Sequence, residues 1–181
     1  MSTPVLTPEQ EAHIGVLVSP YTESQKAIYY SGAAALSATQ KAAMHGFFSE
    51  SILNSVRVIV LVGERVQNPH FYPFLVGLGF INLPDFSLMA AITFCDVVVS
   101  HEPFSAGLLF HQLVHVEQYR QLGVPRLAEL YVRGFLAGGC YEGIPLEINA
   151  YTLAARYKAK PAERFSAAEE VTTWIEEGRF G

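Results

Sequence analysis

Apolar side chains recur at helical spacing over most of this chain, and several helix starts carry capping residues. Thr7, Ser37 and Ser166 are each followed three residues later by Gln or Glu, a combination that caps the first turn of a helix. Gly123 and then Pro125 form a typical helix stop. These signals predict helices over residues 7–18, 37–53, 105–122, 126–137, 145–158 and 166–177.

Two runs rich in β-branched residues interrupt the helical pattern. Residues 56–62 and 91–100 each predict a strand, and the first run ends at Gly63. The connection over residues 68–85 is rich in proline, glycine and aromatic side chains, and it has room for short extra strands. We expect its aromatic residues to shape a pocket for a small or apolar substrate; they include Phe71, Tyr72, Phe74, Phe80 and Phe86. The order of helices, a small sheet and further helices predicts a predominantly helical α+β fold.

Length and composition favour one soluble domain over residues 1–181. Half of the residues are hydrophobic and only 16% are charged, so a membrane span has to be considered. The most apolar stretch, residues 71–99, is interrupted by prolines, an asparagine and two aspartates, which argues against a spanning helix. The first ten residues lack the basic start and apolar run of a signal peptide, so we expect a cytoplasmic protein.

The net charge of -5 gives no basic surface of the kind that nucleic acids attract, so nucleic acid is not an expected partner. Cys95 and Cys140 lie far apart and outside any CxxC pair, and their apolar neighbours predict buried free thiols. The sequence leaves the oligomeric state open.

The chemically most informative residues are two histidines, His111 and His115, on a predicted helix. Residues four apart on a helix share one face, so both imidazole rings can reach one ion. Zinc accepts such nitrogen ligands in a compact tetrahedral set. The spacing alone also fits two ordinary histidines in a helical core, which bind no metal.

The surrounding residues strengthen the metal interpretation. Residues 109–119 read Leu-Phe-His-Gln-Leu-Val-His-Val-Glu-Gln-Tyr, and a predicted strand precedes them. This segment resembles the metal helix of HExxH zincins, particularly bacterial domains with the pattern L-x-H-E-L-x-H-V-x-Q-Y. Residues 147–151, Glu-Ile-Asn-Ala-Tyr, are similar to the downstream E-x-x-A-Y pattern of those domains. Tyr131, Arg133 and Tyr141 resemble the Tyr- and Arg-containing segment between the two motifs.

The resemblance covers residues 91–157 and implies a zincin-like domain whose small β-sheet precedes the metal-binding helix. It implies a metallopeptidase-related scaffold that holds Zn²⁺, or another divalent metal, through His111, His115 and Glu147. Glu142 is the nearest alternative to Glu147 as third ligand. A glutamate in the first turn of a helix is also favoured by the helix dipole without any metal.

One residue departs from the pattern: Gln112 stands where HExxH zincins have glutamate. In zincin peptidases that glutamate takes a proton from the attacking water, which an amide does not do near neutral pH. Losing a general base costs on the order of 10² to 10⁴ in rate. The sequence therefore predicts a poor peptidase whose metal ligands are intact.

Three interpretations of Gln112 stay open. The protein is a metalloenzyme with a different reaction on a small-molecule or peptide substrate, a catalytically silent binding or scaffold module, or an inactivated variant of an active zinc hydrolase. If it is an enzyme, Gln112 and Tyr151 are the candidate catalytic residues, because a phenol near the ion could stabilise a developing oxyanion. Tyr131 and Tyr141 could do the same, although packing is the simpler role for each tyrosine.

Other polar residues near the motif have simpler interpretations. Glu117 lies about 200° around the helix from His115, so it should point away from the metal as a solvated carboxylate or a support to the ligands. Gln118 shares the ligand face and is either a partner of a ligand or a buried amide. Surface or packing positions are expected for the remaining histidines, His13, His45, His70 and His101.

Overall fold

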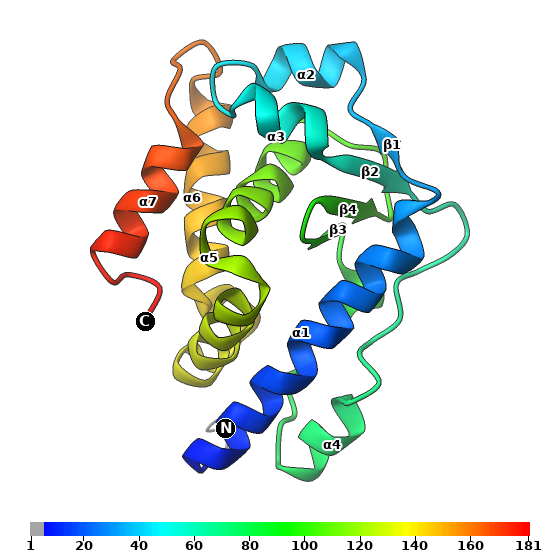
Figure 1. Cartoon of the computed structure of the whole chain (residues 1–181), viewed down its shortest axis with the longest axis vertical. Coiled ribbons are helices and arrows are strands. Elements are labelled where there is room, and N and C mark those ends of the chain that lie inside the picture. Colours follow the sequence, from blue (N-terminus) through cyan, green and yellow to red (C-terminus); the bar gives the residue numbers. More distant parts are fainter. Residues whose placement is uncertain (1–5) are drawn as a thin grey trace.

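The computed structural model describes residues 6–181 and shows a predominantly helical α+β fold (Figure 1). Its helices are α1 (Pro8–Tyr30), α2 (Ala38–Met44), α3 (Glu50–Ser55), α4 (Tyr72–Gly77), α5 (Ala106–Gly138), α6 (Pro145–Ala159) and α7 (Ala167–Glu176). Its strands are β1 (Ala34–Ala35), β2 (Arg57–Val60), β3 (Ala91–Phe94) and β4 (Val97–Ser100). Two 3-10 turns, η1 (Phe86–Leu88) and η2 (Tyr141–Gly143), complete it. The predicted fold class is confirmed.

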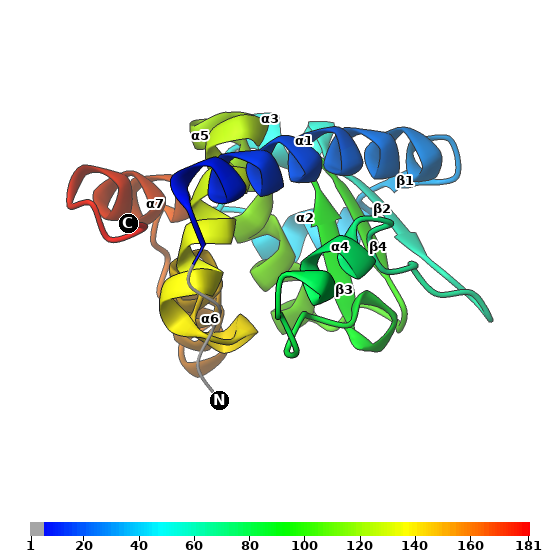
Figure 2. The same ribbon diagram turned by 90° about the horizontal axis from the view of Figure 1, so that it is seen from below.

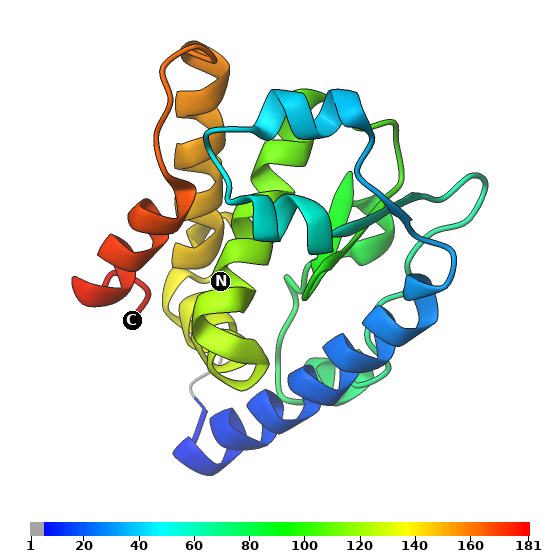
Figure 3. The same ribbon diagram turned by 45° about the horizontal axis from the view of Figure 1, so that its top comes forward.

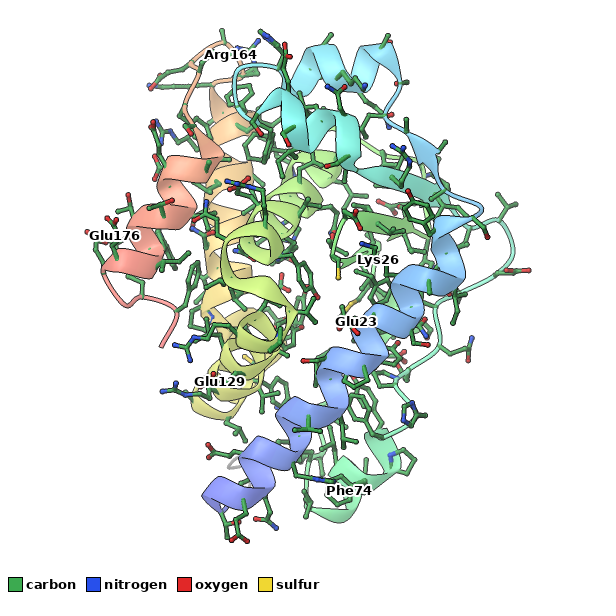
Figure 4. All side chains as sticks on the ribbon, viewed as in Figure 1. Glu23, Lys26, Phe74, Glu129, Arg164 and Glu176 are labelled. Atoms are coloured by element: carbon green, nitrogen blue, oxygen red, sulfur yellow. The ribbon has the colours of Figure 1, made fainter. Side chains whose placement is uncertain are left out.

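The four strands form one sheet in the order β1-β2-β4-β3, and the pair β2–β4 is parallel. The predicted strand over residues 91–100 is two antiparallel strands, β3 and β4, joined at Cys95 and Asp96. Sequence analysis missed the turn because Cys95 is an uncommon residue for its positive φ of 59°. Lys26 of α1 (Figure 4) forms an ion pair with Asp96, with 2.6 Å between Nζ and Oδ1. This ion pair holds the hairpin turn against α1.

Helix α1 is longer than predicted and runs through Pro20 to Tyr30. A proline inside a helix removes one backbone donor. Packing compensates here, because Tyr21 is buried and Tyr29 stacks on Phe94 of the sheet with 6.3 Å between ring centroids. The helix thus lies along one face of the molecule, beside both α5 and the sheet (Figure 2).

The predicted helix over residues 37–53 is two short helices, α2 and α3. Gly46 has a φ of 82°, and Ser49 caps a new helix start, so the chain turns between them. This turn buries Phe47, which packs edge-on against Phe110 at 5.5 Å between ring centroids. Core packing of adjacent aromatic residues therefore outweighs continuation of the helix. The 68–85 connection contains the short helix α4 and none of the short strands that the sequence suggested.

Helix α5 includes both predicted segments, 105–122 and 126–137. Gly123 has the non-helical angles φ 73° and ψ 162°, so the helix changes direction there, as the Gly and Pro signals predict. α5 lies in the centre of the fold, between α6 and α7 on one side and α1 and the sheet on the other (Figure 3). Because every layer packs against it, side chains of α5 can meet residues from distant parts of the chain.

Two further expectations concern exposure. Cys140 is exposed and Cys95 is half-buried, so the prediction of buried thiols is wrong for Cys140. Cys140 immediately precedes η2, at a turn in the surface. Among residues 6–181, no helix combines the length and apolarity needed to cross a membrane.

Candidate metal centre

His111, His115 and Glu147 converge on one buried point. The Nε2 atoms of the two histidines lie 3.1 Å apart, and Glu147 Oε2 lies 3.4 Å from His111 Nε2 and 3.3 Å from His115 Nε2. With metal–ligand bonds of about 2.0–2.1 Å, the ligands of a tetrahedral zinc ion are about 3.3 Å apart. The spacing of the three atoms is therefore close to that of one face of such a tetrahedron.

Two helices supply these ligands. The histidines occupy successive turns of α5, which begins after a Ser105 cap, while Glu147 lies in the first turn of α6. Two glycines let the second half of α5 approach the start of α6. A Cβ at Gly138 would come within 2.7 Å of the Gly143 backbone, and one at Gly134 within 2.6 Å of Pro145. Sequence analysis gave neither glycine a role, because a close backbone approach is visible only in three dimensions.

The carboxylate of Glu147 is buried, and its Oε2 atom has no hydrogen-bond donor among the described residues. Burial alone would raise the pKa of Glu147, but His115 and His111 together hold this pKa below its ordinary value. Burial lowers the pKa of His111. Burial also acts to lower the pKa of His115, but Glu147 and Gln118 outweigh it and raise that pKa. A buried, ionised carboxylate within 3.3–3.4 Å of two imidazole nitrogens is a donor set that suits a divalent cation.

Gln118 fixes the orientation of one ligand. Its Oε1 lies 2.9 Å from His115 Nδ1, so it accepts that N–H and leaves Nε2 free to bind an ion. The Gln118 amide also donates to Leu146 O at 3.0 Å and to Asn149 Oδ1 at 2.9 Å. Gln118 thus combines the two roles that the sequence left open: it is a buried amide and it contacts the candidate ligand His115. It also ties the histidine helix to the helix that carries Glu147.

Gln112 points toward the sheet and toward the cavity beside the ligands. Its Oε1 accepts a 2.7 Å hydrogen bond from the Thr93 hydroxyl of β3. Both residues line the cavity, together with His115 and Glu147. Gln112 is thus placed next to the candidate metal site, with its amide oxygen already engaged and its Nε2 group free to donate to a ligand.

The tyrosines divide between two sides of the centre. Tyr151 packs against His111 with 4.4 Å between ring centroids and 53° between the ring planes, and it is 53% exposed, outside the cavity wall. Tyr131 and Tyr141 line the cavity, where burial and then the Glu147 charge raise the pKa of each phenol. Both therefore stay protonated and can donate. The structure places them, rather than Tyr151, beside the cavity face of Glu147.

The cavity has a volume of about 150 Å³ and its wall is mainly apolar. It is lined by α1, β3, the 69–89 segment, both halves of α5 and the start of α6. Of the aromatic residues expected to shape a pocket, Phe71, Tyr72, Phe80 and Phe86 line it. Phe74 does not; it is 42% exposed on α4, near His13 at the start of α1 (Figure 4).

The remaining acidic and basic candidates lie elsewhere. Glu142 is exposed and outside the ligand group, while Arg133 pairs with Glu129 on the surface of α5 (Figure 4). Glu117 points away from the ligands as predicted. It is not solvated, however: it is 1% exposed and accepts hydrogen bonds from Arg120 at 3.1 Å and Gln121 at 2.6 Å.

His101 has a structural role that the sequence did not indicate. Its Nε2 accepts from the Val66 N–H at 3.0 Å, and its Nδ1 lies 2.6 Å from Met89 O. It therefore fixes the chain on both sides of the aromatic 68–85 connection. The expected surface position is confirmed for His13 and His70, which are exposed.

The fold and the site together define a predominantly helical α+β protein with a buried group of two histidines and one glutamate, close enough to hold a metal ion. No known protein-family model, curated protein or solved structure matches the chain. Arguments about its function therefore rest on the geometry of this group and of the cavity beside it.

Proposed function

We propose that this chain is a zinc-binding protein of zincin-like type, in which His111, His115 and Glu147 bind the ion. The observation that carries the proposal is the triangle of ligand atoms, with sides of 3.1, 3.3 and 3.4 Å, one corner of which is a buried carboxylate oxygen. Burying an ionised carboxylate is costly, and a bound cation would offset that cost. A bound zinc ion would supply a Lewis acid that polarises an oxygen-bearing ligand.

The residues around the group favour ligand binding over peptide hydrolysis. Gln112 occupies the position of a general base, and its amide does not accept a proton near neutral pH. It can donate a hydrogen bond to a bound ligand, and Tyr131 and Tyr141, which also line the cavity, can do the same. The second candidate function, a silent scaffold with a purely structural ion, is less well supported, because the cavity reaches His115 and Glu147.

The test is the metal content of protein purified without a metal-affinity column. We expect about one equivalent of zinc in the parent, and loss of zinc in His111→Ala and Glu147→Ala because each removes one of three ligands. His70→Ala and Glu142→Ala are matched controls, since both residues are exposed and outside the group, and they should keep the zinc. A parent protein that carries no zinc and whose melting temperature is unchanged by added zinc would refute the proposal.

A further inference from the structure

The cavity beside the ligand group has an uneven distribution of polarity, which points to the chemistry of its ligand. Among the described residues that line it, the only histidine or carboxylate side chains are those of His115 and Glu147, where α5 meets α6. Tyr21 and Tyr72 also line it, but their hydroxyls donate to backbone carbonyls, at 3.1 Å to Gln67 O and 2.9 Å to Pro84 O. Their rings therefore add apolar surface to the wall.

Charge at the polar end is unbalanced once zinc is bound. Two positive charges on zinc and one negative charge on Glu147 leave one net positive charge, because the histidines bind as neutral ligands. No other carboxylate lines the cavity among the described residues. In apolar surroundings such a charge favours an anionic ligand. A glutamate at position 112 would have supplied that negative charge, and Gln112 does not.

Gln112 is oriented to help hold an anion. Because Thr93 donates to Oε1 of Gln112 at 2.7 Å, the Nε2 group is the end of the amide left to donate to a ligand. An N–H donor stabilises a carboxylate oxygen and gives nothing to a cationic group. The rest of the cavity lining is mainly aromatic and aliphatic, and it includes Phe80, Leu83 and Phe135.

We infer that the cavity binds a small apolar monocarboxylate, with its carboxylate between the metal site and Gln112 and its hydrocarbon part among the aromatic side chains. This rests on the proposed function, since the carboxylate needs the bound cation. A cavity of about 150 Å³ is the size of the engineered apolar cavity that takes benzene, so about six carbon atoms fit. The ligand is therefore a carboxylate with a hydrocarbon part of that size.

The experiment is calorimetric titration of the zinc-loaded protein with straight-chain carboxylates from acetate to decanoate. Affinity should rise roughly fourfold for each added methylene and level off beyond about six carbons, when the cavity is full. Hexanamide, which has the same chain without the charge, should bind at least about tenfold more weakly than hexanoate. Equal affinity of acetate and hexanoate, or of hexanamide and hexanoate, would overturn the inference.

Two variants test the two ends of the cavity. Gln112→Glu should weaken hexanoate binding at least about tenfold while the zinc content stays unchanged, whereas Gln67→Glu, the same charge change on the surface, should not. Ala128→Leu should reduce the effect of chain length while acetate binding persists; its melting temperature shows whether it folds. Zinc bound without these effects refutes the inference and leaves the metal site standing, while absence of zinc refutes both.

Discussion

Gln118 offers the sharpest test of how the two ligand helices are joined, through the substitution Gln118→Met. Methionine has a similar shape and removes the three contacts to His115 Nδ1, Leu146 O and Asn149 Oδ1, which are 2.9–3.0 Å long. At about 1 kcal/mol for each hydrogen bond, the loss is about 3 kcal/mol, and polar atoms left buried without partners raise it toward about 5 kcal/mol. Because His115 also loses the acceptor that orients its ring, zinc affinity should fall about 10- to 100-fold.

Two assays separate these effects. Urea unfolding of the metal-free protein gives the change in free energy of unfolding, and competition with a chromophoric chelator gives the change in zinc affinity. Gln67→Met is the matched control, because Gln67 is exposed and its side chain bonds only to Arg65 O. If Gln118→Met lowers the free energy of unfolding but keeps the parent's zinc affinity, Gln118 holds the helices together without orienting His115, and our account of the ligand is wrong.

Three further predictions concern packing, charge and pH. Gly138→Ala should lower the free energy of unfolding by about 1–3 kcal/mol, because its Cβ would meet the Gly143 backbone at 2.7 Å. In the same urea assay, Gly107→Ala should lower it much less, because that Cβ would meet only the end of the flexible Lys158 side chain. Glu117→Gln should destabilise the protein by about 1–3 kcal/mol through its lost charge pairing with Arg120, but should keep full zinc content by elemental analysis, unlike Glu147→Gln. The rise in melting temperature on adding zinc should shrink below about pH 6, since protons then compete with zinc for the two histidines; a rise that persists to about pH 4 would argue against histidine ligands.

Local signals in the sequence were sufficient for most helix starts. The cap residues Thr7, Ser37 and Ser166 each begin a helix in the structure, because capping depends on neighbouring residues only. The end of α1 was predicted at Val18, twelve residues before its observed end at Tyr30. Contacts with the sheet stabilise this extension, and sequence periodicity does not report such contacts. The hairpin turn at Cys95 and Asp96 was missed because cysteine is an uncommon residue at a positive φ.

The sequence by itself determined which side chains could bind a metal. The spacing of His111 and His115 places both on one helix face, and the resemblance to zincins selected Glu147 over Glu142. The exposure of Glu142 agrees with that selection. The sequence also identified Gln112 as the departure from the zincin pattern. The amide of Gln112 lies at the cavity, so this departure matters for ligand binding.

Only the tertiary structure decided how these residues are arranged. The 3.1–3.4 Å triangle depends on the packing of α5 against α6, which Gly134 and Gly138 permit and Gln118 fixes. The placement of Tyr131 and Tyr141 at the cavity, with Tyr151 outside, likewise depends on the direction that α5 takes after Gly123. The physical reason is that spacing along a helix fixes a local angle, whereas distances between helices are set by close packing of residues far apart in the chain.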